Sequence, residues 1–152
     1  MSNIPHGPWE NEWTVVDELG LGGQGMTYLV KHQRSSQQAV LKLLKKRKSA
    51  RARNRMKQEV TNLQMLHNSG IKAPKVLDDN MQVLEDAAQK LYFIMEYVDG
   101  EDLRKTVEDH GPFSLEQAAK VVQDLSQVIA EAHDNGILHR DLKPAEPAQR
   151  NQ

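Results

Sequence analysis

The first part of the chain contains short hydrophobic stretches that are rich in β-branched and aromatic residues and separated by glycine or polar segments. This pattern is typical of β-strands. It predicts strands at residues 13–16, 26–30, 38–44, 75–77 and 90–98. Glycines between the first two stretches predict a hairpin turn, and the proline- and glycine-rich residues 1–12 predict a flexible lead-in.

Apolar positions change to a helical spacing after the third predicted strand. Met56, Val60 and Leu63 recur at steps of three and four residues, as on one face of an α-helix. This spacing predicts a helix over residues 50–67. Because it interrupts the series of strands, the helix is expected to pack against the sheet that those strands form.

Two further helices are predicted near the end of the chain, over residues 101–109 and from Ser114 onward. Ser114 and Gln117 have the spacing of a capping box, in which each side chain bonds to the other residue's backbone N–H. Asn135 followed by Gly136 is a typical helix end. The long helix between these signals carries an apolar stripe.

Composition excludes several classes of protein. The 152 residues carry a formal net charge of −1, which gives no overall attraction to nucleic acid or to an anionic membrane. There is no cysteine, so disulfides and thiolate metal sites are excluded. Hydrophobic runs are far shorter than the roughly 20 residues of a membrane span, and the N-terminus lacks a secretory signal pattern. A cytoplasmic protein is expected.

Residues 20–25 read Gly-Leu-Gly-Gly-Gln-Gly, and such glycines occur in several kinds of nucleotide site. A dinucleotide-binding fold requires a following helix and a later acidic residue, whereas a strand and Lys42 occur here. A Walker loop requires Lys before Ser or Thr, whereas Met26 and Thr27 follow the last glycine. Two interpretations remain: a glycine-rich hairpin over ATP phosphates, and an ordinary hairpin turn.

Glu59 lies between Met56 and Leu63 on the predicted helix, on or beside its buried face. Burying a carboxylate is costly unless it is paired with a cation. Lys42, on the strand expected beneath this helix, is the predicted partner. The alternative is a surface glutamate at the edge of the apolar stripe.

A dense basic run follows the third predicted strand and continues into the helix. It is interpreted as a solvated linker and the first helical turns, and the alternative is a docking site for an acidic partner or nucleic acid. Its members are Lys45, Lys46, Arg47, Lys48, Arg51, Arg53, Arg55 and Lys57.

Residues 139–144 read His-Arg-Asp-Leu-Lys-Pro. The carboxylate of Asp141 can accept the proton of a hydroxyl, and the amine of Lys143 can neutralise charge on a phosphate. Together with the glycine segment and Ala-Val-Leu-Lys at residues 39–42, in this order, the motif resembles the signature of a eukaryotic-type serine/threonine protein kinase domain. The resemblance covers residues 13–144.

This resemblance implies an α+β fold, with an antiparallel sheet and one packed helix in the N-lobe and an incomplete helical C-lobe. Residues 13–98 would form the N-lobe and hinge, 99–144 a partial C-lobe, and 145–152 a tail without kinase character. Asp141 would be the catalytic base, assisted by Lys143. The implied ATP-binding residues are Gly20, Leu21, Gly22, Gly23, Gln24, Gly25, Thr27, Val40, Lys42 with its partner Glu59, the gatekeeper Met95, and the hinge residues Glu96, Tyr97 and Val98.

The sequence departs from the family pattern at the metal site. ATP and Mg²⁺ are the expected cofactors, but Glu146 stands where the family places a metal-binding asparagine. The Asp-Phe-Gly segment that supplies the other metal ligand does not occur, so no metal ligand is assigned. Thr27 and Val40 also replace a usual valine and alanine. We therefore expect a truncated kinase domain that is inactive, or nearly so, on its own.

Several interpretations of this chain stay open. Ala-Glu-Pro at residues 145–147 fits a shifted reading frame of an Ala-Asn-Leu loop, and the alternatives are a fragment and a functional short form. The expected function is ATP-dependent phosphorylation of protein serine or threonine hydroxyls, and the alternative is a non-catalytic, pseudokinase-like nucleotide-binding module. Arg140 and Lys143 disfavour a small-molecule kinase. Expected partners are a protein substrate or regulator, with self-association through the exposed face of the long helix, and neither nucleic acid nor membrane.

Overall fold

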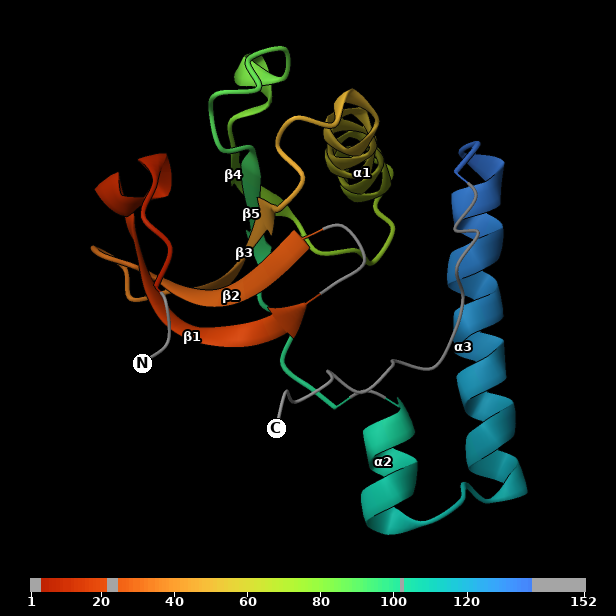
Figure 1. Cartoon of the computed structure of the whole chain (residues 1–152). Helices are drawn as coiled ribbons and strands as arrows, with labels where there is room; N and C mark the ends of the chain where they lie inside the picture. Colours follow the sequence, from red (N-terminus) through yellow and green to blue (C-terminus); the bar gives the residue numbers. More distant parts are fainter. Residues whose placement is uncertain (1–3, 22–24, 102, 138–152) are drawn as a thin grey trace. The chain divides into compact units, whose positions relative to one another are not determined.

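The computed structural model describes residues 4–21, 25–101 and 103–137 (Figure 1). The chain divides into two compact units. One comprises Met1–Gln64 with Pro74–Val98, and the other comprises Met65–Ala73 with Asp99–Gln152. The first unit contains the sheet, and the second contains two helices.

Five antiparallel strands form the sheet of the first unit, in the order β1-β2-β3-β5-β4. With the helix that packs on it, the sheet confirms the expected α+β class, an antiparallel sheet with one packed helix. The strands are β1 (Trp13–Leu21), β2 (Gly25–His32), β3 (Gln38–Leu44), β4 (Val76–Asp79) and β5 (Tyr92–Glu96).

Buried side chains alternate between the two faces of the central strands, as period-two geometry requires. On β5, Tyr92 and Ile94 belong to one hydrophobic cluster, whereas Phe93 between them belongs to a second cluster. The first cluster includes Leu41 of β3 and both tryptophans. Because both faces of β5 are covered, this strand reads in the sequence as a continuous hydrophobic run.

Helix α1 (Ala50–Asn68) covers the face of the sheet that carries Phe93 (Figure 1). Met56 and Val60, one turn apart on this helix, are 0% and 3% exposed and pack in the second cluster. The Ser49 hydroxyl accepts a hydrogen bond from the Ala52 N–H and so caps the helix at its first turn. The predicted helix over residues 50–67 is confirmed.

The N-terminal segment differs from the flexible lead-in expected over residues 1–12. Pro8–Asn11 forms a short 3₁₀-helix, η1, and the Trp9 side chain is 1% exposed. Its indole meets the Tyr92 ring edge-on, with 5.1 Å between ring centroids. Gly7 permits this packing, because a Cβ there would lie 2.3 Å from the indole. Burial of the large Trp9 side chain stabilises this segment, despite the flexibility expected from its Pro- and Gly-rich sequence.

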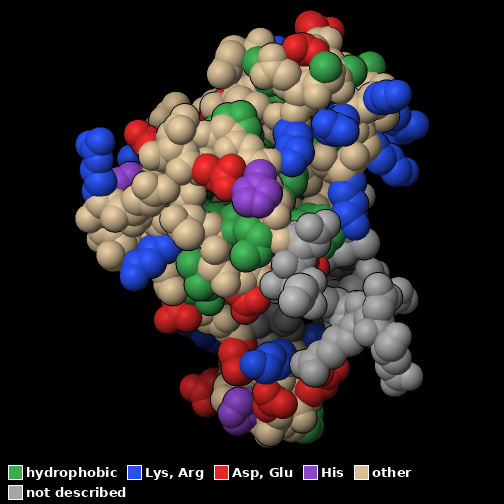
Figure 2. All heavy atoms as spheres, turned by 60° about the vertical axis from the view of Figure 1, so that its left-hand side comes forward, with side chains coloured by type: hydrophobic (Ala, Val, Ile, Leu, Met, Phe, Trp, Pro, Cys, Tyr) green, Lys and Arg blue, Asp and Glu red, His purple; other side chains and the backbone are tan. Residues whose placement is uncertain are grey.

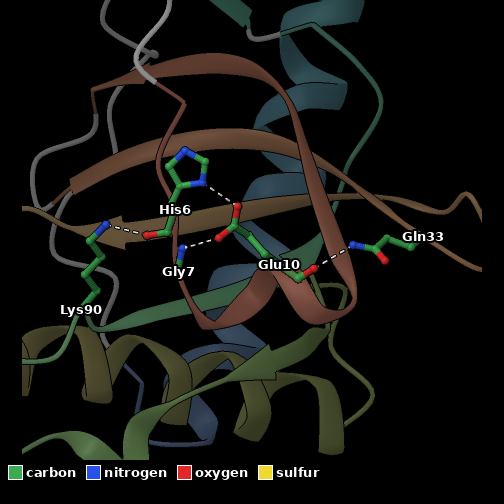
Figure 3. A network of polar contacts seen from close by, with 5 residues as sticks. All are labelled: His6, Gly7, Glu10, Gln33 and Lys90. Carbon is green, nitrogen blue, oxygen red and sulfur yellow. Dashed lines mark hydrogen bonds and ion pairs between the residues drawn. The ribbon is translucent and has the colours of Figure 1, made fainter.

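Polar contacts hold the same segment on the sheet unit (Figure 3). The Lys90 ammonium donates to the His6 carbonyl at 2.6 Å and lies 6.0 Å from the Trp9 ring. The Glu10 carboxylate accepts from the Gly7 N–H at 2.9 Å and contacts the His6 ring nitrogen Nδ1 at 2.8 Å. The Gln33 amide donates to the Glu10 carbonyl at 2.8 Å. Residues distant in sequence thus fasten the N-terminal segment.

The second unit contains helices α2 (Leu103–His110) and α3 (Leu115–Asp134). The predicted capping box at the start of α3 is confirmed, with the Gln117 N–H donating to the Ser114 hydroxyl and the Ser114 N–H donating to the Gln117 side chain. None of the described helices is long and apolar enough to cross a membrane.

Candidate nucleotide-binding site

Lys42 and Glu59 form the central pair of the candidate site. Lys42 lies on β3, between Thr27 of β2 and Phe93 of β5 in the strand register. Its Nζ atom is 2.6 Å from Oε1 of Glu59 on α1, and the two side chains are 15% and 28% exposed. The contact predicted from the sequence is confirmed, since the helical spacing turns Glu59 toward the sheet.

The surroundings of this pair favour a fixed lysine. Nζ of Lys42 lies 5.9 Å from the centroid of the Phe93 ring, a geometry in which the ring attracts the cation. Sequence reasoning gave Phe93 no role, because only the strand register reveals its place beside Lys42. The second carboxylate oxygen of Glu59 is buried and has no hydrogen-bond partner among the described residues. The carboxylate can therefore accept one more hydrogen bond.

Both described ends of the glycine segment have backbone features that require glycine. Gly20 has φ of 132°, which L-residues with side chains rarely adopt. A Cβ on Gly25 would lie 2.1 Å from the Leu43 carbonyl oxygen, so β2 and β3 approach here only because the side chain is missing. Gly22, Gly23 and Gln24 lie outside the described residues.

Thr27 stabilises the hairpin in a way that its sequence position did not reveal. Its hydroxyl donates a hydrogen bond to the Gly20 carbonyl at 2.9 Å, across the β1–β2 ladder in which the two residues are partners. The usual valine at this position has no such donor. The hydroxyl is therefore used within the sheet, and Leu21, the last residue of β1, pairs with Met26 next to this bond.

Val40 and Met95 are paired neighbours on β3 and β5. Val40 is 9% exposed and Met95 is partly buried. Glu96 ends β5, and its carboxylate accepts from the Lys75 N–H at 3.0 Å. Tyr97 and Val98 follow the strand and are 38% and 67% exposed. Strand β5, Tyr92–Glu96, is thus shorter than the strand predicted over 90–98.

Asp141, Lys143 and Glu146 lie outside the described residues, as does the whole segment from His139 to Pro144. The described part of the site therefore comprises the sheet, the α1 carboxylate and the hinge segment. Within this part of the chain, no group of three His, Cys, Asp or Glu side chains could hold a metal ion.

Comparison with known proteins places these features in one family. Residues 13–146 match the family model of the protein kinase domain. The serine/threonine-protein kinase PknB of Mycobacterium leprae is 33% identical over 150 residues, which are 95% of this chain and 23% of that protein. Calcium-dependent protein kinase 5 of Plasmodium falciparum is 32% identical over 128 residues, with coverages of 84% and 21%.

A crystal structure of the PknI kinase domain from Mycobacterium tuberculosis superposes with a TM-score of 0.62 at 26% identity. The match covers 88% of this chain and 53% of that domain. This chain thus spans under a quarter of the length of these two curated relatives. Because the family match covers most of the chain and the fold agrees, the chain belongs to the protein kinase domain family, and its relatives named here include serine/threonine kinases.

Proposed function

We propose that this chain provides the nucleotide-binding side of a serine/threonine protein kinase domain, which transfers phosphate from ATP to protein hydroxyls. The observation that carries the proposal is the 2.6 Å contact between Lys42 on β3 and Glu59 on α1. Strand β3 pairs with β2, the strand that begins at Gly25. A lysine held in this way presents its charge at a fixed place. Fixed charge is what phosphate binding requires.

The described residues fit ATP. Glu59 orients the Lys42 ammonium, which offers further N–H donors to phosphate oxygens. Gly20 and Gly25 give the strands beside the glycine segment a backbone path that side chains would block, and glycines in such a segment let backbone N–H groups approach phosphate oxygens. Val40 and Met95 supply an apolar surface for a base, and the backbone of residues 96–98 provides donors and acceptors for its edge. Bound ATP would supply the phosphoryl group.

The chemical step falls on residues assigned from the sequence. Asp141 would accept the proton of the substrate hydroxyl while the hydroxyl oxygen bonds to the γ-phosphorus of ATP and the bond from that phosphorus to the departing ADP breaks. Lys143 would neutralise charge on the transferred phosphate. Glu146 differs from the family's metal-binding asparagine, and metal positioning contributes much of the rate in phosphoryl transfer. We therefore propose that turnover is low.

The same substitution favours a second function, a non-catalytic module that binds nucleotide and regulates a protein partner. The two functions differ in their dependence on metal. A working kinase needs Mg²⁺ to hold the phosphates, so its affinity for an ATP analogue should rise when Mg²⁺ is added. A regulatory module should bind the analogue equally well without the metal and show no transfer to a protein substrate.

Calorimetric titration with a non-hydrolysable ATP analogue tests the site. Lys42→Met removes a charged donor to phosphate, so affinity should fall about ten- to a hundredfold, as expected for a charge-assisted bond of about 1.5–3 kcal/mol. Glu59→Gln keeps the hydrogen-bonding shape but removes the charge, and should have a smaller effect. Lys31→Met, at an exposed position of β2, is the matched control and should bind as wild type.

Equal affinities for the Lys42→Met, Lys31→Met and wild-type proteins would remove Lys42 from the site. Phosphate transfer from labelled ATP to a generic protein substrate, with and without Mg²⁺, then distinguishes the kinase from the regulatory module.

A further inference from the structure

Exposed basic side chains are concentrated on the connection between β3 and α1 and on the first turns of α1. We define the basic surface by its exposed members Lys45, Lys46, Arg47, Lys48, Arg51, Arg55 and Lys57. Figure 2 shows Lys and Arg side chains gathered at the upper right of the molecular surface. The candidate nucleotide site contains none of these residues.

The segment that carries the basic surface contains no acidic side chain of its own. No Asp or Glu occurs between residues 45 and 58, although acidic residues outnumber basic ones in the chain by 21 to 20. Among the described residues, the ion pairs involve Lys42, Lys105, Lys120 and His6, none of which belongs to the basic surface. Several like charges this close create a positive potential that attracts anionic groups.

The buried side chain of Arg53 anchors the start of α1, which carries these charges. Arg53 is 3% exposed, and its guanidinium donates to the carbonyls of Leu84, Val83 and Gln89 in the segment that precedes β5. These bonds tie that segment to the start of α1. Arg47 adds a donor to the Ala88 carbonyl at 3.4 Å. Arg53 thus has a structural role, whereas the members of the basic surface other than Arg47 are exposed to solvent.

A hollow of about 530 Å³ lies between these two segments. Its lining consists of Lys45, Lys46, Arg47, Lys48 and Ser49 on one side and Ala87 and Ala88 on the other. The adjoining acidic residue Asp86 is engaged within its own loop, where its carboxylate accepts from the Ala88 N–H and the Gln89 amide, both at 2.9 Å. Exposed Glu85 precedes it, and together these two carboxylates are outnumbered by the seven exposed cations.

We propose that the basic surface binds an acidic peptide segment of a protein partner, with carboxylate or phosphate-bearing side chains in the hollow. The charges provide complementarity, and the two alanines leave room for a peptide chain. A single-stranded nucleic acid fits less well, because residues 45–57 contain no aromatic side chain on which a base could stack, and a duplex, which needs no stacking, is included in the test. The proposal does not depend on nucleotide binding, since Lys42 and the basic surface are different residues.

Fluorescence anisotropy with short labelled peptides tests the proposal. The probes are a peptide with several aspartates, the same peptide with phosphoserines, the same peptide with serines, and a short DNA duplex. The variant Lys45→Gln, Lys46→Gln and Lys48→Gln removes three of the four positive charges that line the hollow. The matched control, Lys31→Gln, Arg34→Gln and Lys75→Gln, removes the same charge at exposed positions elsewhere in the sheet unit.

Wild type should bind the acidic peptides and not the serine peptide, and more salt should weaken binding. The lining variant should bind about tenfold more weakly, because each exposed ion pair contributes modestly and three are lost. The control variant should match wild type. Tighter binding of the phosphoserine peptide than of the aspartate peptide would identify a phosphorylated partner. Equal binding of the two peptides would identify a carboxylate-rich partner.

The proposal fails if wild type binds neither acidic peptide, if the control variant loses as much affinity as the lining variant, or if the DNA duplex binds more tightly than the peptides. Equal melting temperatures of the two variants, measured by circular dichroism, ensure that a loss of affinity reflects the surface and not the fold.

Discussion

Asp78 is a half-buried carboxyl beside the core residue Tyr92. The Tyr92 hydroxyl donates to Oδ2 of Asp78 at 3.2 Å. Burial raises the pKa of Asp78 above its ordinary value of 3.8 and outweighs the hydrogen bond from Tyr92, which lowers it; the charges of Asp79 and Glu12 add to the rise. Burial also raises the pKa of Tyr92, so its hydroxyl keeps the proton that it donates.

The raised pKa gives stability a definite pH dependence. A group whose folded pKa is raised contributes stability below its unfolded pKa, and this contribution is lost as pH rises through the folded pKa. At neutral pH the charged Asp78 therefore lowers stability. Asp78→Asn should be more stable than wild type at pH 7, because the amide oxygen still accepts from Tyr92 without the buried charge.

Urea unfolding at pH 7 and at about pH 4 measures the difference in free energy of unfolding between Asp78→Asn and the wild type. This difference should shrink at the lower pH, because Asp78 in the wild type then takes up its proton. Asp79→Asn, at the neighbouring residue, is the control and should raise the free energy of unfolding at pH 7 by less than Asp78→Asn does. A variant that is less stable than wild type at pH 7 would contradict the prediction.

Single-residue contacts were predictable where a residue broke the hydrophobic pattern. Glu59 could be paired with Lys42 from the sequence, because a carboxylate beside a buried helix face needs a cation and the strand beneath supplied one. The hydrogen bond from Thr27 to the Gly20 carbonyl could not be predicted from the sequence, since a threonine in a strand needs no partner. That contact depends on the exact strand register, whereas an alternating pattern alone fixes only the face of the sheet on which a residue lies.

Among the elements, the strands and helices of regular periodicity were predictable, whereas η1 was not. Its one buried residue, Trp9, sits among prolines and glycines, so no hydrophobic period marks it. The contacts that fix it reach Tyr92 and Lys90 in the distant part of the chain. These long-range contacts leave no local pattern in the sequence by which η1 could be predicted.

Trp9→Ala should therefore destabilise the sheet unit strongly. Truncating a buried tryptophan typically costs about 3–5 kcal/mol. Trp9→Phe should cost less, because Nε1 of Trp9 has no hydrogen-bond partner among the described residues and an aromatic ring remains against Tyr92. Chemical denaturation followed by far-ultraviolet circular dichroism gives both values. A cost below about 1 kcal/mol for the alanine variant would show that the segment contributes little to the fold.

At the scale of the whole molecule, the long helix α3 carries an exposed apolar stripe. Its stripe includes Leu115, Val122 and Leu125, which are 88%, 63% and 44% exposed. Removing each such side chain fully from water is favourable by about 1.5–3 kcal/mol of free energy. We therefore predict self-association through this helix face.

Analytical ultracentrifugation should show an average mass that rises with protein concentration. The double variant Val122→Lys and Leu125→Lys should stay monomeric, whereas Gln123→Lys and Ser126→Lys, at exposed polar positions of the same helix, should associate like wild type. A wild-type chain of monomeric mass at every concentration would refute this prediction.

The two tryptophans of the chain, Trp9 and Trp13, both lie in the first hydrophobic cluster of the sheet unit. They are 1% and 4% exposed, so their emission is shielded from water until that unit opens. Intrinsic fluorescence is thus a site-specific optical probe of one half of the molecule, while helical ellipticity also reports the other half. Melting curves recorded with both signals will coincide if the two units unfold as one cooperative block, and will separate if they do not.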